Sequence, residues 1–248
     1  MARICEKDIL FFGGYESSSN TVLKWNIRSK TWGELPAMNQ SRRLPSVVEL
    51  DDKIYAIGGR GDDKMLLQSV EMYTTSSGWE FVKPLITARY STDAVTLNGK
   101  IYVLGGLSKN ILNDLKSVEC YNPDSNTWTS CADMIKGHYG TGAAAHNGHI
   151  YVSGGSGNLY RAVERYDPQR DTWSEICCLN TDGTYCSRIA FASLDNKLWT
   201  IGGLVGSGRK ANVSVYDEEN DCWIKKSLLS KGSIYFCFVV PASLLPSN

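Results

Sequence analysis

The amino-acid sequence predicts an all-β fold made of five similar four-stranded units, and three recurring features predict it. A glycine doublet recurs five times, an aromatic–tryptophan pair follows each doublet, and a tight-turn dipeptide precedes four of the doublets. One such coincidence would carry no weight. Repetition in register over the whole chain of 248 residues indicates a single structural unit used five times.

The glycine doublets lie 45, 47, 49 and 48 residues apart. Each doublet follows a short apolar run, which is typical of a buried strand. The doublets are Gly13-Gly14, Gly58-Gly59, Gly105-Gly106, Gly154-Gly155 and Gly202-Gly203. Glycine at a strand end permits backbone paths that other residues disfavour, so we assign the doublets to the fold and not to a ligand.

An aromatic residue follows each doublet, and a tryptophan follows that residue six or seven positions later. The pairs are Trp25/Trp32, Tyr73/Trp79, Tyr121/Trp128, Tyr166/Trp173 and Tyr216/Trp223. The near-constant spacing is typical of a third and a fourth strand joined by a short turn. We expect these large side chains to pack between the units.

The first and second strands of four units are joined by dipeptides that favour tight hairpins. They are Asp51-Asp52, Asn98-Gly99, Asn147-Gly148 and Asp195-Asn196. A type I′ turn needs positive φ at both central residues, which these residue types tolerate best. Each full unit is therefore predicted to be four antiparallel strands within about 50 residues.

The doublet after the second strand, together with the spaced Tyr…Trp pair, resembles the kelch repeat, and the resemblance covers essentially the whole chain. It implies a single domain over residues 1–248, a five-bladed β-propeller with four antiparallel strands per blade. The blades are expected at 9–34 plus 233–240, 45–82, 92–131, 141–176 and 189–226.

The strand count predicts how the ring closes. A first strand precedes only four of the doublets, and a lone strand-like run, Ser233–Val240, follows the last blade. Pairing that run with the blade begun by Ile9–Phe12 would remove two open sheet edges. A six-bladed ring that has lost one blade upstream is the alternative.

Composition excludes several classes of function. The formal net charge is +0, with 26 basic and 26 acidic residues, which argues against a nucleic-acid binder. No apolar run is long enough to span a membrane, and the first residues do not resemble a signal peptide. The eight cysteines show no metal-binding spacing, which favours reduced thiols in the cytoplasm or nucleus over a disulfide set.

The loops of variable length are all predicted to lie on one face of the disc. The second-to-third-strand loops and the blade-to-blade linkers vary in length, and strand alternation places both classes on the same side. Counting charges predicts about six excess basic residues there and about five excess acidic residues on the opposite face. Variable loops on a rigid scaffold are typical of a binding surface, so we expect this face to hold an acidic segment of another protein.

Arginine and tyrosine dominate hot spots in protein interfaces, and the variable face is rich in both. Arg42, Arg89 and His138 each lie 16 residues before a doublet, which suggests a ring around the channel mouth. The expected partner contacts, most of them by resemblance to kelch loop positions, are Tyr15, Arg42, Arg43, Arg60, Arg89, Tyr90, His138, Tyr139, Tyr185, Ser187, Arg188 and Tyr235. His138 and Cys186 depart from the arginine expected at those positions.

Catalysis is not expected, nor is a cofactor or a metal. The histidines 138, 146 and 149 have no metal-site spacing, and no nucleophile elbow occurs. The vicinal thiols Cys177 and Cys178 could be redox-active, but two ordinary strand-end cysteines are the simpler interpretation.

Among kelch proteins, the chain is most similar to the intracellular kelch-like (BTB-kelch) adaptors. That resemblance implies a monomeric propeller that captures a substrate protein or a short degron peptide, while a BTB domain outside this chain binds a cullin 3 ubiquitin ligase. Five blades imply a narrower pocket than six. The alternative is a cytoskeletal, actin-associated scaffold.

Overall fold

The computed structural model describes seven stretches of the chain, and the structural statements below concern these residues. They are 2–5, 8–13, 19–108, 114–154, 162–179, 189–202 and 212–228.

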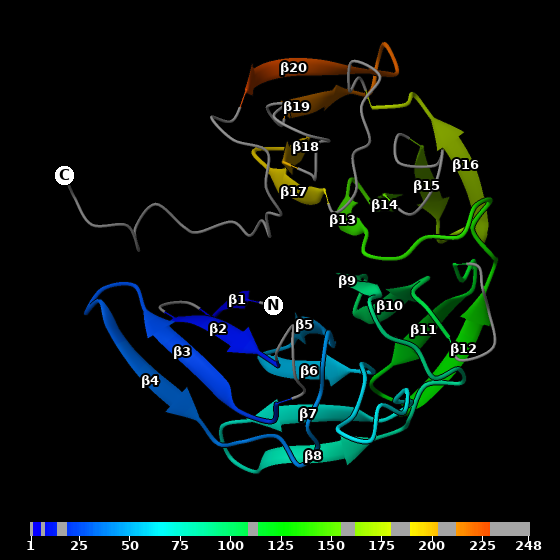
Figure 1. Cartoon of the computed structure of the whole chain (residues 1–248). Coiled ribbons are helices and arrows are strands. Elements are labelled where there is room, and N and C mark those ends of the chain that lie inside the picture. The colour runs from blue at the N-terminus through cyan, green and yellow to red at the C-terminus, as the bar shows by residue number, and fades with distance from the viewer. Residues whose placement is uncertain are drawn as a thin grey trace.

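Five antiparallel sheets of four strands each are arranged as blades around a ring (Figure 1). Blade 1 holds β1 (Ala2–Cys5), β2 (Asp8–Phe12), β3 (Val22–Asn26) and β4 (Thr31–Leu35). Blade 2 holds β5 (Ser46–Leu50), β6 (Lys53–Ile57), β7 (Val70–Thr74) and β8 (Gly78–Val82). Blade 3 holds β9 (Asp93–Leu97), β10 (Lys100–Leu104), β11 (Val118–Asn122) and β12 (Thr127–Cys131). Blade 4 holds β13 (Gly142–His146), β14 (His149–Ser153), β15 (Val163–Asp167) and β16 (Thr172–Ile176). Blade 5 holds β17 (Ala190–Leu194), β18 (Lys197–Gly202), β19 (Asn212–Asp217) and β20 (Cys222–Leu228). The predicted five-bladed all-β fold is confirmed.

The hairpin turns have the backbone that their sequences predict. Asp51 and Asp52 have φ of 51° and 58°, and Asn98 and Gly99 have φ of 51° and 70°. Positive φ at both positions is the signature of a type I′ turn, whose twist matches that of the flanking strands. These turns fix the register of each inner hairpin, and with it the side chains that face the neighbouring blade.

The apolar core lies between successive blades. Between blades 2 and 3, for example, Val48 and Tyr55 pack with Val103 and Tyr121. The rings of Tyr55 and Tyr121 are 5.8 Å apart in an edge-on arrangement, which is favourable for aromatic pairs. No helix in the described part of the chain has the length and apolar character needed to cross a bilayer.

The recurring tryptophans join the blades by hydrogen bonds as well as by packing. In blades 2 to 5 the indole Nε1 donates to a carbonyl oxygen just after the preceding blade. The pairs are Trp79 to Pro36 (2.8 Å), Trp128 to Lys83 (2.8 Å), Trp173 to Ala132 (3.0 Å) and Trp223 to Cys177 (3.0 Å). The expectation of interblade packing is therefore confirmed for these four, whereas Trp32 of blade 1 is 61% exposed.

In blade 1, another strand occupies the position beside β2 that was predicted for Ser233–Val240. The strand beside β2 on its inner side is β1, which pairs Ala2 with Phe11 and Cys5 with Asp8. Because β3 occupies the other side of β2, no edge of β2 is left for Ser233–Val240. The described strands of blade 1 therefore all come from the first 35 residues, and Ser233–Val240 lies outside the described residues.

Polar bonds tie the inner strands together close to the axis. Ser46 Oγ on β5 donates to the Thr92 carbonyl oxygen at 3.0 Å. Asp93 on β9 accepts from the backbone N–H groups of Ala94 (2.9 Å) and Ala143 (2.8 Å), the second of which belongs to blade 4. Burial raises the pKa of the Asp93 carboxyl to about 7, and the two N–H donors only partly oppose this effect.

The raised pKa of Asp93 predicts a dependence of stability on pH. Between its unfolded pKa of about 4 and its folded pKa, the folded protein holds a proton that the unfolded chain has lost. The free energy of unfolding should therefore fall as pH rises from 5 to 8. Relative to Asp93→Asn, which does not titrate, we expect the wild type to lose about 2 to 3 kcal/mol over this range in urea unfolding. A difference that stays constant with pH would contradict the assignment.

Candidate functional site: the loop face and its clasps

The loops after the second strands and the linkers between blades lie on one face, and the linkers are held by buried ion pairs. Each described linker between consecutive blades carries a cationic or potentially cationic side chain that points into the following blade. We call these three pairs the clasps: Arg42 with Glu71, Arg89 with Glu119, and His138 with Glu164.

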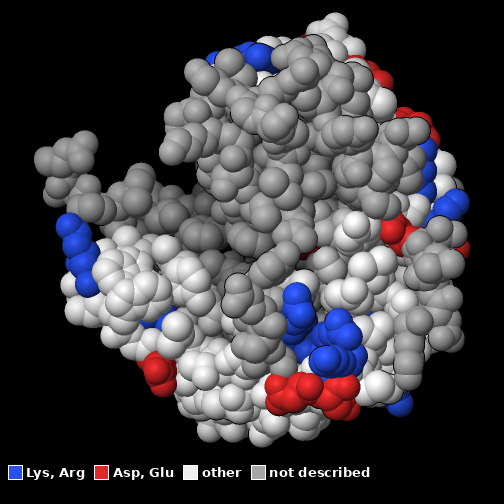
Figure 2. Space-filling view, in the orientation of Figure 1, with Lys and Arg blue, Asp and Glu red and all other residues white. Residues whose placement is uncertain are grey.

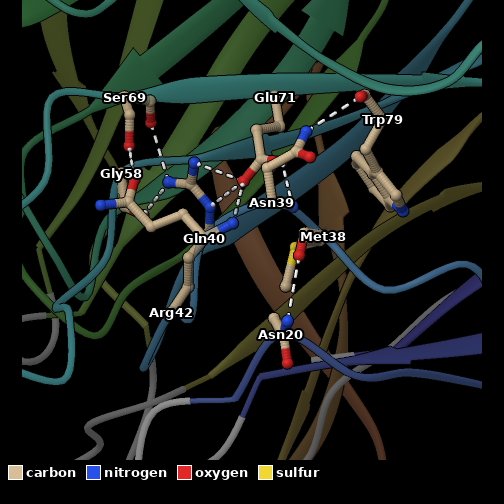
Figure 3. Close-up of polar contacts among 9 residues, drawn as sticks. All are labelled: Asn20, Met38, Asn39, Gln40, Arg42, Gly58, Ser69, Glu71 and Trp79. Atoms are coloured by element: carbon tan, nitrogen blue, oxygen red, sulfur yellow. Dashed lines mark hydrogen bonds and ion pairs between the residues drawn. The ribbon is translucent and has the colours of Figure 1, made fainter.

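The Arg42 clasp uses the whole guanidinium group (Figure 3). Its Nη1 donates to the carbonyl oxygens of Gly58 and Ser69, each at 2.8 Å. Its Nη2 donates to Glu71 Oε1 at 3.0 Å. The same carboxylate accepts the linker N–H groups of Asn39 (2.6 Å) and Gln40 (3.1 Å), so the linker is held to blade 2 through both its side chain and its backbone.

The Arg89 clasp repeats this geometry one blade later. Arg89 Nη1 donates to the carbonyl oxygens of Gly105 and Ser117, each at 2.9 Å, and Nη2 donates to Glu119 at 2.6 Å. Glu119 accepts the N–H groups of Ile86 (2.7 Å) and Thr87 (3.0 Å).

The glycine doublets make room for the linker backbone. A Cβ placed on Gly58 would lie 2.6 Å from the Arg89 carbonyl oxygen, and one on Gly105 would lie 2.2 Å from that of His138. Both glycines also have positive φ, of 59° and 57°. The linker backbone therefore contacts the glycine doublet of the preceding blade. The clasp side chain of the same linker contacts the glycine doublet of the following blade.

The third clasp replaces arginine by a shorter side chain, and a neighbouring serine compensates for the difference. His138 Nδ1 contacts the Gly154 carbonyl oxygen, and Nε2 lies 2.8 Å from Glu164 Oε1. Each ring nitrogen thus lies within hydrogen-bonding distance of an oxygen atom, one on the loop and one on the third strand. The Ala162 carbonyl, which corresponds to the Ser69 and Ser117 carbonyls, accepts from Ser153 Oγ at 2.8 Å. Blades 2 and 3 have Ile57 and Leu104 at the position of Ser153. No hydroxyl donor is needed there, because the clasp arginine donates to the equivalent carbonyl oxygen.

These contacts overturn the expectation that Arg42, Arg89 and His138 form a partner-binding ring. Their exposed fractions are 0%, 1% and 0%, and their polar atoms are directed at the protein itself. The reason is a buried glutamate on the third strand, which sequence reasoning missed. A usable signal was present, because Glu71, Glu119 and Glu164 each precede the recurring tyrosine by two residues.

Burial also sets the electrostatics of the clasps. Desolvation lowers the pKa of Arg42 and of Arg89, while the adjacent glutamates oppose this effect. Arginine has so high an intrinsic pKa that both groups stay charged. Two of the basic residues counted toward a positive face are therefore neutralised inside the protein.

The residues that follow the clasp side chains remain at the surface rim and are half-buried. Arg43 pairs with Arg60 through reciprocal backbone hydrogen bonds of 2.7 and 2.9 Å. Tyr90 pairs in the same way with Leu107, and Tyr139 follows His138 in the next linker.

Successive linkers are bonded to one another around this rim. Ser91 N–H donates to the Leu44 carbonyl at 3.4 Å, and Gly140 N–H donates to the Ser91 carbonyl at 2.9 Å. The structure therefore brings the predicted contacts Arg43, Arg60, Tyr90 and Tyr139 onto one continuous band, which we call the rim. The other predicted contacts, Tyr15, Tyr185, Ser187, Arg188 and Tyr235, lie outside the described residues.

The charge on this face is mixed. The β6–β7 loop that carries Arg60 also carries the exposed residues Asp62, Asp63 and Lys64. Figure 2 shows basic atoms directly beside acidic atoms where this loop lies in Figure 1. Along this described loop, any recognition of charge is therefore local, because basic and acidic side chains alternate within it.

The described residues offer no group of three or more histidine, cysteine or acidic side chains placed to hold a metal ion. His138 belongs to a clasp, His146 Nδ1 lies 2.8 Å from Ser193 Oγ, and His149 Nδ1 lies 2.9 Å from the Asn147 carbonyl. Burial raises the pKa of Cys177, which disfavours the reactive thiolate.

Comparison with known proteins matches two family models to the chain. The KLHDC2/KLHL20/DRC7 Kelch-repeats domain matches residues 1–203, and the Kelch motif matches residues 185–227. Together these matches cover nearly all of the described strands.

Several curated relatives share the repeats. Kelch-like protein 36 of Bos taurus is 25% identical over 229 residues, which cover 88% of this chain and 36% of that protein. Kelch repeat and BTB domain-containing protein 1 of Camelpox virus is 28% identical over 234 residues, which cover 89% of this chain and 40% of that protein. Alpha-scruin of Limulus polyphemus is 32% identical over 133 residues, which cover 48% of this chain and 14% of that protein. The chain thus spans between a third and two fifths of the length of the first two of these relatives.

Breaking one clasp should destabilise the domain strongly. Arg89→Met leaves Glu119 charged, buried and without its cation, which costs about 3 to 5 kcal/mol in comparable sites. Arg170→Met is the matched control, because the Arg170 side chain is 82% exposed and should change stability by no more than about 0.5 kcal/mol. Urea unfolding measures the free energy of unfolding of both variants. An equal, small loss of stability in the two would contradict a stabilising role for the clasp.

The compensation between His138 and Ser153 can be tested by a double-mutant cycle. Ser153→Leu alone leaves the buried Ala162 carbonyl without a donor, which should cost about 1 to 3 kcal/mol. Adding His138→Arg restores the pattern of blades 2 and 3, so the double variant should be more stable than Ser153→Leu. Strictly additive free energies in the cycle would show that the two positions are not coupled.

Proposed function

The chain belongs to the kelch-repeat family, and we propose that it is the substrate-capturing domain of a cullin-RING ubiquitin ligase adaptor. Relatives that share the repeats are named as kelch-like and as BTB-containing proteins. In this proposal the propeller binds a protein or a short degron peptide, and a BTB domain outside the chain binds cullin 3. Ubiquitin transfer itself is the work of other subunits.

The observation that carries the proposal is the rim. Arg43, Tyr90 and Tyr139 each follow a clasp residue directly, so a buried contact anchors the backbone at the position before each of them. Rigidly held loops lose little entropy on binding, and arginine and tyrosine are the residue types that contribute most in protein interfaces.

The chemistry of the rim favours a short segment with an acidic residue. Arg43 and Arg60 are joined through their backbones, and Arg60 Nε donates to the Lys64 carbonyl at 2.9 Å, which orients its guanidinium group. A partner carboxylate could pair with the remaining donors of Arg60, while Tyr90 and Tyr139 offer flat apolar surface with a polar end. Asp62 and Asp63 lie nearby and would oppose a partner with acidic residues along its whole length.

The proposal can be tested by proximity labelling in cells with two variants. Arg60→Ala combined with Tyr90→Ala should reduce labelling of true partners by at least about tenfold, because hot-spot truncations cost 1 to 2 kcal/mol or more. Arg170→Ala, an exposed change in the turn between β15 and β16, should retain the same partners. Equal labelling by both variants would contradict the rim as the capture surface.

The ligase role has its own readout. Partners lost by the rim variant should rise in abundance when the protein is depleted and when cullin neddylation is blocked. A partner that binds the rim but whose abundance stays constant in both conditions would contradict the ligase role. Binding of that partner at the rim would still stand.

A cytoskeletal, actin-associated scaffold is the second candidate, and the similarity to alpha-scruin favours it. Cosedimentation of the chain with actin filaments distinguishes the two. Filament binding that survives the rim double variant, with no change in partner abundance on depletion, would support the scaffold instead.

A further inference from the structure

Blade 1 presents a face that differs from the corresponding face of every other blade. In blades 2 to 5 this face packs on the preceding blade, and its tryptophan is bonded there; Trp79, for example, is 8% exposed. The equivalent Trp32 is 61% exposed, and among the described residues its indole N–H has no acceptor. Its ring lies 5.3 Å from that of Phe11 and 5.2 Å from that of Trp25, and Leu23 beside them is 39% exposed.

The polar contacts that receive a preceding blade are also missing from blade 1. Leu23 stands two residues before the recurring aromatic, where blades 2 to 4 have the clasp glutamate.

A second recurring contact is absent as well. In blade 4, Tyr166 Oη donates to Asp171 at 2.7 Å, and Asp171 accepts the Ala132 N–H of the preceding linker at 2.8 Å. Blades 3 and 5 repeat this relay through Asn126 and Asp221. Blade 1 has Trp25 and Lys30 at the two positions, so it cannot form the relay.

Blade 5 has apolar exposed residues on the face that would meet a following blade. Ile224 is 39% exposed and stands where blades 2 to 4 have Glu80, Thr129 and Ser174. Leu194 on the same face is 42% exposed. Figure 1 shows β20 ending on the side of blade 5 where blade 1 lies.

We propose that the aromatic face of blade 1, formed by Phe11, Leu23, Trp25 and Trp32, is a docking surface for the chain's own C-terminal segment, residues 229–248. This segment continues directly from β20 and contains one charged residue, Lys231, and the apolar run Ile234–Val240. Twenty residues can reach about 60 Å when extended, which exceeds the width of a small domain. A largely apolar segment matches a face that lacks both the clasp glutamate and the relay, with Glu34 beside Leu23 as the charged residue at its edge.

The proposed contact is distinct from strand pairing in blade 1, because β1 and β3 already occupy both sides of β2. It also has a physical rationale. A seven-residue β-prone run left in water is an aggregation hazard, and so is an exposed cluster of two tryptophans and a phenylalanine. When the apolar run docks on the aromatic cluster, both are shielded from water.

The test compares trypsin cleavage after Lys231 in three full-length proteins, followed by mass spectrometry. Cleavage should be slow in the wild type and at least tenfold faster in Trp32→Glu, which places a charge in the aromatic face. Phe81→Glu is the matched control, since Phe81 is an outer-strand aromatic that is 57% exposed, and it should cleave at the wild-type rate. Equal rates in all three proteins would overturn the proposal.

A second measurement guards against a variant that simply unfolds. Hydroxyl-radical labelling of the wild type should modify Trp32 at least fivefold more slowly than its 61% exposure in the described structure implies, with Phe81 as the internal reference. Labelling of Trp32 in line with that exposure would overturn the docking. Trp32 could also be protected only at concentrations where sedimentation shows a dimer. That result would overturn the proposal, because a second copy of the chain would then cover the face.

Discussion

The arrangement of the loop face depends on one interaction, the buried pair between a linker cation and a glutamate of the following blade. Two full charges inside a protein are costly unless each is paired and fully hydrogen-bonded. Here the cation donates to carbonyl oxygens at the start and end of the second-to-third-strand loop, and the glutamate accepts two linker N–H groups. Linker, loop and third strand are thereby held in one geometry, and breaking any part leaves a buried charge without its partner.

This constraint links the repeat pattern to the surface. The first glycine of the doublet is needed because the following linker passes too close for a Cβ, as the 2.2 Å approach at Gly105 shows. The linker then carries its clasp residue inward and the next residue to the rim. The buried clasps therefore hold three rim residues at equivalent positions, namely Arg43, Tyr90 and Tyr139.

The fold was largely predictable from the sequence, and the direction of the linker side chains was not. Strands and turns follow from local chemistry, since Asn98-Gly99 and the apolar run before Gly105 specify their own geometry. Arg42 and Arg89 looked like surface ligands because arginine is rarely buried without a partner, and their partners lie about 30 residues away on another strand. The strand Ala2–Cys5 was missed because four residues with no hairpin signal before β2 carry too little pattern to be recognised. The predicted contacts on the rim stay predictions, since geometry alone does not say what binds them.

Amide hydrogen exchange on the native protein tests the clasp most directly. The N–H groups of Ile86 and Thr87 lie in a linker without regular secondary structure and donate to the Glu119 carboxylate. If the clasp holds the linker, these two amides should exchange as slowly as those of the adjacent strand β10, because both then need a large opening of the structure. Exchange at the rate of the exposed turn residues would show that the linker opens freely and that the clasp does not organise the face.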